Sequence, residues 1–225
     1  MSKFYNTSKS LFVTNKGFQA LEKISFKLYK GETLGLIGES GSGKTSLSNA
    51  ILKIHKFEEG EIYFNGHDIS KIQGKELLGF RKNIQIVFQD PYASLNPLHN
   101  IYQIISEPLI FHKICGKEDL YDECKKLIND VGLSENYLNS YPHELSGGQR
   151  QRVCIARAIS VKPQVLICDE SVSALDVSIQ ATVLNLLNQL KQKYSFTYIF
   201  ISHDLSVVRH MSDKILVLHN GKIVE

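Results

Sequence analysis

Several features that mark particular protein classes are missing from this sequence. It has no block of about five like charges and no apolar run of about 18 residues, the length that crosses a bilayer. The formal charge of +3 is small and scattered, which gives no support for a nucleic-acid partner. Residues 1–6 contain no apolar stretch of signal-peptide length. We therefore expect a cytoplasmic protein.

Cysteine is scarce, and its spacing matches no common metal-binding motif. The four cysteines form no CxxC pair and have no histidine at zinc-finger spacing. Cys154 and Cys168 lie inside apolar runs, where we expect small core residues. Cys115 and Cys124 could share a helical face, but neither a disulfide nor a metal site follows from that.

The composition is that of a globular chain, with 43% hydrophobic and 22% charged residues. A length of 225 residues suits one large domain, which would bury roughly 70% of its unfolded surface. The sequence shows no internal repeat, low-complexity segment or linker. We expect a single domain over residues 1–225.

Apolar runs and alternations predict strands that alternate with helices. The expected strands are 10–13, 24–28, 33–37, 84–88, 165–168 and 198–202. The expected helices are 45–54, 120–131, 149–160 and 177–194, and the expected hairpins are 60–66 and 214–224. On the first helix we expect Leu47, Ile51 and Ile54 to share one face. This order predicts an α/β fold with a mainly parallel sheet covered on both faces, and the hairpins predict a smaller antiparallel sheet beside it.

A glycine-rich loop fits GxxxxGK[ST] at every fixed position, between an expected strand and an expected helix. Its glycines let backbone N–H groups point inward as an anion cradle, and the helix N-terminus adds partial positive charge. We expect Lys44 to lie between the β- and γ-phosphates of a nucleotide and the Thr45 hydroxyl to hold Mg²⁺. The predicted nucleotide-binding residues here are Gly38, Glu39, Ser40, Gly41, Ser42, Gly43, Lys44, Thr45 and Ser46.

Two carboxylates end the apolar run 165–168, where ligands collect in open α/β sheets. Adjacent strand side chains point in opposite directions, so we expect Asp169 and Glu170 to do different things. Asp169 suits the Mg²⁺ shell, and Glu170 suits a general base that orients the attacking water. The alternative is an exposed acidic turn, which the phosphate loop makes less attractive.

A second glycine turn, at residues 145–149, reads LSGGQ. Ser146 can cap the following helix, while Gly147 and Gly148 allow close backbone approach to an anion. Taken alone, the string is equally a loop with a capped helix. Since a nucleotide needs one phosphate cradle, we interpret the second turn as completing a site on a different protein molecule.

The order of phosphate loop, Gln89, LSGGQ, Asp169-Glu170 and His203 resembles the ATP-binding subunit of ABC transporters, over essentially the whole chain. The resemblance implies that Gln89 contacts Mg²⁺ and the attacking water and senses the membrane partner. It implies that His203 is the switch histidine at the γ-phosphate and that residues 173–176 cross a dimer interface. It also implies that Ser146, Gly148 and Gln149 close over ATP held by the opposite subunit.

The same resemblance implies an aromatic residue that stacks on adenine. Phe12 is the first choice and Phe18 the second, with Phe12 equally a core strand residue. It further implies a RecA-like core with an antiparallel β subdomain, over about 1–90 and 161–225. Residues 91–160 form the implied inserted helical subdomain.

A narrower resemblance lies in residues 88–97, FQDPYASLNP, together with residues 35–41, GLIGESG. These strings are similar to the branch of importers for oligopeptides, dipeptides or nickel chelates. Members of this branch usually continue well past the equivalent of Val224, so the protein is short or the sequence is a trimmed domain.

The resemblance implies an ATP- and Mg²⁺-dependent ATPase that drives such an importer from the inner face of the cell membrane. Its partners would be a second subunit, identical or paralogous and head to tail, two membrane permeases and, indirectly, an external binding protein. The alternatives are a soluble non-transport ABC ATPase and a regulatory ATP-binding module. An intact Glu170 and His203 argue against the regulatory module.

Overall fold

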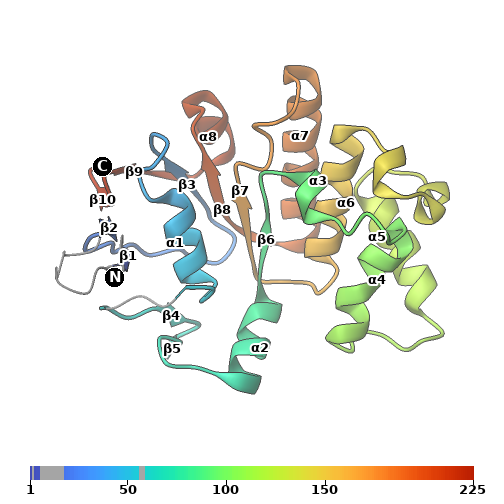
Figure 1. Ribbon diagram of the computed structural model, residues 1–225, viewed down its shortest axis with the longest axis horizontal. Coiled ribbons are helices and arrows are strands. Elements are labelled where there is room, and N and C mark those ends of the chain that lie inside the picture. The colour runs from blue at the N-terminus through green and yellow to red at the C-terminus, as the bar shows by residue number, and fades with distance from the viewer. Residues whose placement is uncertain (2, 6–17, 56–58) are drawn as a thin grey trace, which may run out of the picture.

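Six strands form the central sheet of the computed structural model, which describes residues 1, 3–5, 18–55 and 59–225 (Figure 1). Its order is β10-β9-β3-β8-β7-β6. The bounds are β3 Thr33–Ile37, β6 Ile84–Val87, β7 Val165–Asp169, β8 Thr197–Ser202, β9 Lys214–His219 and β10 Lys222–Ile223. All neighbours pair in parallel except β10, which runs antiparallel to β9.

Alternate residues of the central strands pack into two different hydrophobic clusters. On β8, Tyr198 and Phe200 join one cluster, whereas Ile199 and Ile201 join the other. Every residue of β8 is buried, as expected for a parallel strand covered on both faces. The strand period of two therefore fixes two cores, one on each side of the sheet.

One core lies against helix α1, Lys44–Ile51, whose Leu47, Ala50 and Ile51 are buried. The other lies against α6, Gly147–Ile159, α7, Val177–Tyr194, and α8, Leu205–Met211. The bounds of α7 are those predicted from the sequence.

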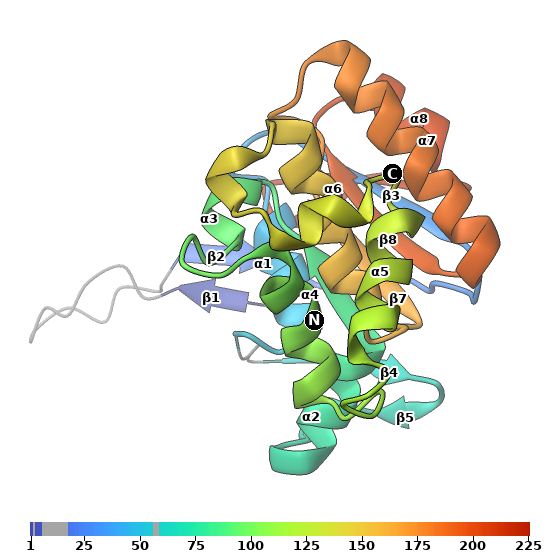
Figure 2. The ribbon, with the colours of Figure 1, turned by 90° about the vertical axis from the view of Figure 1, so that its right-hand side faces the viewer.

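Between β6 and β7 the chain is helical. The elements are α3 Pro91–Ser94, α4 Ile101–Phe111, α5 Leu120–Asp130, the 3₁₀ helices η1 Glu135–Asn139 and η2 Pro142–Glu144, and then α6. Figure 2, which looks from this side, shows α4, α5 and α6 next to one another, and their buried residues belong to one cluster. The predicted helix near 120–131 is α5.

The small elements lie at the other end of Figure 1. Strands β1, Lys3–Tyr5, and β2, Phe18–Leu21, form a two-stranded antiparallel sheet. Strands β4, Tyr63–Phe64, and β5, His67–Asp68, form a second hairpin, which is the one predicted around 60–66. Helix α2, Gly74–Asn83, follows it. Sequence reasoning missed α2, which buries only Phe80 and so carries little apolar periodicity.

Some predicted elements differ from the structure. The predicted strand 10–13 lies outside the described residues. Residues 24–28 do not form the predicted strand. Their side chains do alternate as expected, since Ile24 is buried and Phe26 and Leu28 pack against the core that contains α1. Ile54 was expected on the face of α1, but the helix ends at Ile51 and Ile54 is 49% exposed. The left-handed Lys53 (φ 53°) turns the chain there.

The predicted C-terminal hairpin forms, but it extends the main sheet instead of standing beside it, since β9 pairs in parallel with β3. Cys154 and Cys168 are buried core residues, as expected. Cys124 is buried on α5, whereas Cys115 precedes that helix, so the two do not share a helical face. Among the described residues, no helix combines the length and apolarity needed to cross a bilayer.

Candidate functional site

The loop between β3 and α1 has the geometry of a phosphate cradle. Gly41 (φ +81°) and Gly43 (φ +107°) adopt left-handed conformations that side chains rarely accept. A Cβ on Gly43 would come within 2.6 Å of the Ala20 carbonyl oxygen, and one on Gly38 within 2.3 Å of the Leu218 carbonyl oxygen. The backbone of this loop therefore depends on glycine at these positions.

Lys44 opens α1 directly after this loop and is only 6% exposed. Its ammonium donates hydrogen bonds to the carbonyl oxygens of Gly38 (2.7 Å) and Glu39 (2.9 Å). The same Nζ lies 3.7 Å from a carboxylate oxygen of Glu170. The buried positive charge thus faces both the loop and the end of β7.

Glu170 occupies an unusual backbone position immediately after β7. Its φ of +48° places a non-glycine residue in the left-handed region, which is uncommon and costs about 1–2 kcal/mol. Its N–H donates to the Ile201 carbonyl oxygen (2.9 Å), and its own carbonyl accepts from the Ser173 N–H and hydroxyl. These bonds hold the strained turn and aim the carboxylate out of the strand.

His203 meets this carboxylate from the adjacent strand. It follows β8, and its Nδ1 lies 3.4 Å from Oε2 of Glu170. The next residue, Asp204, caps α8 by accepting hydrogen bonds from the N–H groups of Ser206 (2.8 Å) and Val207 (3.3 Å). The half-buried carboxylate of Glu170 is thus flanked by Lys44 on one oxygen and by the exposed imidazole of His203 on the other.

Asp169 has different neighbours. It is buried at the end of β7, and its carboxylate accepts a hydrogen bond from the Ser48 hydroxyl (3.3 Å). Burial raises the pKa of Asp169, and the adjacent Glu170 adds to the rise, while hydrogen bonds from Ser48 and Thr45 and the charge of Lys44 oppose it. Sequence reasoning missed Ser48, although its position four residues after Lys44 places both on one helix face.

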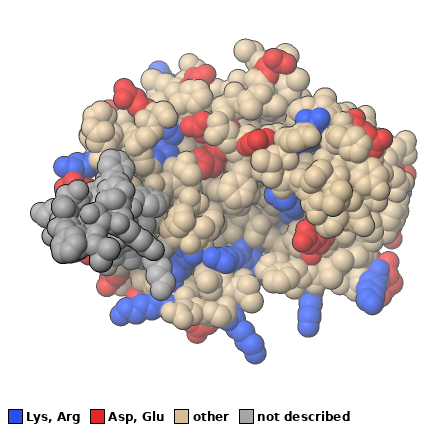
Figure 3. All heavy atoms as spheres, in the orientation of Figure 1, with Lys and Arg blue, Asp and Glu red and all other residues tan. Residues whose placement is uncertain are grey.

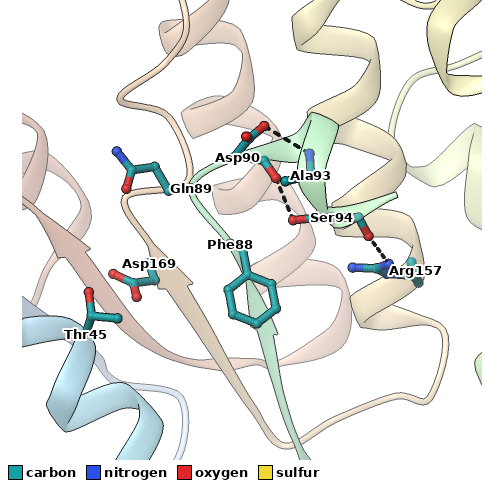
Figure 4. Close-up of a pocket in the computed structure, with 8 residues that line it drawn as sticks. All are labelled: Thr45, Phe88, Gln89, Asp90, Ala93, Ser94, Arg157 and Asp169. Carbon is teal, nitrogen blue, oxygen red and sulfur yellow. Dashed lines mark hydrogen bonds between the residues drawn. The ribbon is translucent and has the colours of Figure 1, made fainter. Parts of the chain in front are cut away.

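A hollow of about 610 Å³ opens beside Asp169 (Figure 4). Thr45, Gln89 and Asp169 lie on one side of it, and Ser94 and Arg157 lie on the other. Gln89 is exposed, two residues beyond the end of β6. Arg157 was not among the predicted residues, because nothing in the sequence placed α6 beside this hollow.

The turn of residues 145–149 lies elsewhere. Ser146 caps α6, its hydroxyl accepting from the Gln149 N–H (3.3 Å), while the Gln149 side chain accepts from the Ser146 N–H (2.8 Å). In the part of the chain that is described, no hydrogen bond or ion pair joins Ser146, Gly148 or Gln149 to residues 38–45. The two glycine-rich turns thus make no polar contact with each other, and the helices that they open, α1 and α6, pack into different cores.

The remaining predicted residues add little here. Phe12 lies outside the described residues, and only the backbone of Phe18 is described, in β2.

No group of three His, Cys, Asp or Glu side chains that could hold a metal ion occurs within the described residues. Charges of both signs are spread over the face seen in Figure 3, with no continuous basic field.

Comparisons with known proteins identify the family of the chain. The family model described as ABC transporter matches residues 21–173. The oligopeptide transport ATP-binding protein OppF of Streptococcus mutans is 51% identical over 216 residues, which cover 94% of this chain and 70% of the relative. The oligopeptide transport ATP-binding protein AppF of Bacillus subtilis is 47% identical over 227 residues, covering 100% of this chain and 69% of the relative.

The fold also matches solved structures. A dimeric post-hydrolysis state of the ATP-binding cassette MJ0796, bound to ADP and Pi, is similar with a TM-score of 0.86 and 29% identity, covering 100% of this chain and 94% of that one. A second dimeric structure of the same cassette gives a TM-score of 0.83 at 30% identity, covering 100% and 97%. The chain belongs to the ABC transporter family.

Proposed function

We propose that this chain is the ATP-hydrolysing subunit of an importer for peptides. The observation that carries the proposal is the meeting of Lys44, Glu170 and His203 from the ends of three adjacent strands. The names of the related oligopeptide transport proteins support peptides as the cargo.

The residues present fit nucleotide phosphates and Mg²⁺. The buried ammonium of Lys44 and the left-handed glycines of the loop form a concave, positively charged backbone site at a helix N-terminus. Asp169 and Thr45 offer oxygen ligands to Mg²⁺, which binds through one or two carboxylates plus substrate phosphates instead of an all-protein cage. Gln89, on the same side of the hollow, adds an amide oxygen.

The roles follow from charge and position. ATP would supply the phosphate bond that is broken, and Mg²⁺ would neutralise part of the phosphate charge. Glu170 orients the attacking water and receives its proton, which requires Lys44 to leave the carboxylate and turn to the phosphates. His203 then lies on the opposite side of that carboxylate, where it can donate a hydrogen bond to the γ-phosphate.

The position of the Ser146 turn supports a dimeric enzyme. Because Ser146 and Gly148 lie apart from the loop 38–45 within one chain, we infer that they close over the phosphates held by a second subunit, identical or paralogous. The dimeric cassette structures support this arrangement. The helical region of residues 91–160 and Gln89 would contact two membrane permeases on the inner face of the membrane, with an external binding protein delivering cargo.

The Glu170→Gln variant tests the enzyme. We expect ATP hydrolysis to fall by a factor of at least about 100, because the general base is lost, while ATP binding persists and ATP-bound dimers accumulate. Glu76→Gln, at an exposed position of α2 outside that helical region, is the matched control and should hydrolyse ATP at the wild-type rate. Unchanged turnover in Glu170→Gln would refute the catalytic assignment.

Transport is tested separately. Purification of the native complex from its source should recover membrane permeases, and vesicles containing that complex should import labelled oligopeptides only with ATP inside. Recovery of a soluble complex without permeases would favour a non-transport ATPase, and import of a nickel chelate without peptide import would correct the cargo.

A further inference from the structure

Three side chains of α6 contact the short helix that follows Gln89. Arg150, Cys154 and Arg157 lie four and three residues apart, so they form one stripe on the helix. Their partners all belong to α3, which begins two residues after Gln89.

Arg157 makes the strongest of these contacts. Its Nη1 donates a hydrogen bond to the Ser94 carbonyl oxygen at 2.6 Å, a charge-assisted contact of the stronger kind. The Arg150 guanidinium lies 5.1 Å from the centre of the Tyr92 ring, within cation–π range. The Cys154 thiol lies 3.8 Å from the Pro91 carbonyl oxygen and adds a weak contact.

The segment held by these residues is itself a closed unit. The Asp90 carboxylate accepts hydrogen bonds from the N–H groups of Tyr92 (2.8 Å) and Ala93 (3.2 Å). The Ser94 hydroxyl donates to the Asp90 carbonyl oxygen at 2.6 Å. A turn closed in this way moves as one piece, and Gln89 is attached directly to its first residue.

The same helix carries the Ser146 turn at its start. Ser146 and Gln149 close a capping box there, and α6 continues without interruption to Ile159. The Ser146 turn and the contact between Arg157 and Ser94 are therefore joined by one uninterrupted helix, the kind of rigid element along which coupling can run.

We propose that Arg157 is a positioning residue that fixes Gln89 relative to Asp169 and Thr45 across the hollow of Figure 4, and links Gln89 mechanically to the Ser146 turn. The proposal rests on the proposed function, since it assigns Gln89 a place in ATP hydrolysis. In a head-to-tail dimer this contact would couple the two ATP sites, because each chain would give Gln89 to one site and Ser146 to the other.

The test compares Arg157→Met with Arg152→Met in the full chain. Arg152 is the matched control because it lies on the same helix and also donates through Nη1 to a backbone carbonyl, that of Gly132 at 3.1 Å, away from Gln89. Hydrogen exchange of residues 88–95, measured without nucleotide, should accelerate about tenfold in Arg157→Met. It should stay at the wild-type rate in Arg152→Met.

Steady-state ATP hydrolysis is the second measurement. We expect kcat of Arg157→Met to fall about tenfold with KM changed less than about twofold, since misplacing a group by 1 Å can cost about 100-fold. Combining Arg157→Met with Gln89→Ala should lower kcat no further than Gln89→Ala alone, because both changes act through one group. Arg157→Lys, which keeps one charged donor, should recover part of the loss.

Wild-type exchange in residues 88–95 of Arg157→Met, or the same acceleration in Arg152→Met, would overturn the proposal. Fully additive losses in the double variant would do so as well. If Arg157→Met does not fold, Arg157→Gln repeats the exchange measurement with a milder change, and a wild-type result there also overturns it. A wild-type chain that hydrolyses no ATP in its native complex would instead defeat the proposed function, while the exchange result still decides the contact.

Discussion

Gly148 is predicted to be required for stability as well as for a ligand. A Cβ built on Gly148 lies 2.5 Å from Cγ2 of Ile179, in the first turn of α7. Ordinary carbon–carbon contacts are about 3.5–4.0 Å, so Gly148→Ala requires a shift of about 1 Å or more. Ile179 cannot easily yield, since a β-branched side chain in a helix is confined to essentially one χ1 rotamer.

The size of the effect follows from two opposing terms. Overpacking costs about 1–3 kcal/mol, whereas alanine in a helix gains up to about 1 kcal/mol over glycine. We expect Gly148→Ala to lower the free energy of unfolding by about 0.5–2 kcal/mol, which lowers Tm by about 1–8 °C for a chain of this length. Calorimetry of the nucleotide-free protein measures this directly.

Two further variants isolate the cause. Gly147→Ala is the matched control, because a Cβ there meets only Cδ2 of Leu175 at 3.7 Å, and its Tm should equal or exceed that of the wild type. Ile179→Ala removes the Cγ2 that the new Cβ would meet. The double variant Gly148→Ala, Ile179→Ala should therefore lose about 1 kcal/mol less free energy of unfolding than the two single variants lose together. A Gly148→Ala protein that melts at or above the wild-type temperature would refute the steric argument.

Two other sites give separate predictions. Burial raises the pKa of Asp169 in the folded protein above the ordinary 3.8. As the pH rises above 3.8, this carboxyl ionises in the unfolded chain before it ionises in the folded one, so the free energy of unfolding falls. Asp169→Asn should therefore stabilise the nucleotide-free protein against urea at neutral pH, with the gain vanishing below pH 3.8; a constant gain at all pH values would contradict this. Asp130 accepts hydrogen bonds from Lys193 and Tyr194 and joins α5 to α7. In urea unfolding, Asp130→Ala should lower the free energy of unfolding by about 2–3 kcal/mol and Tyr194→Phe by about 1–2 kcal/mol. Wild-type midpoints in both variants would show that these contacts between α5 and α7 do not stabilise the fold.

The central strands could be predicted from the sequence because each is a short, mainly apolar run, and two of them are followed directly by a glycine or a carboxylate. Residues 33–37 and 165–169 are examples, and burial on both faces leaves such runs few alternatives. Residues 24–28 show the limit of this reasoning. Their alternation correctly predicts the inward side chains of Ile24, Phe26 and Leu28, but a strand also needs a partner along its length, and periodicity does not reveal one.

Short capped helices were the harder case. Helix α8 is 7 residues long and was missed, although Asp204 provides its N-cap. A cap signal is local and common, whereas the apolar periodicity that identifies a helix needs about three turns to become visible. Helix α3 lies in a region that was expected to be helical, but its bounds could not be predicted, because its 4 residues are stabilised by Asp90 and by contacts from α6, which lies far away in the sequence.

The sequence could name candidate residues such as Lys44, Glu170 and His203, but not Ser48 or Arg157, and the way the candidates come together depends on the order of the strands. Lys44, Glu170 and His203 follow β3, β7 and β8, which are adjacent in the sheet and parallel, so their loops meet at one edge. Gln89 follows β6, one strand further out, and lies across the hollow from Arg157. The Ser146 turn follows no strand of this sheet, since η2 precedes it and α6 follows it. The topology thus brings the loops after β3, β6, β7 and β8 to one edge of the sheet and leaves this turn out, which is the physical reason for proposing that the turn serves the site of a second molecule.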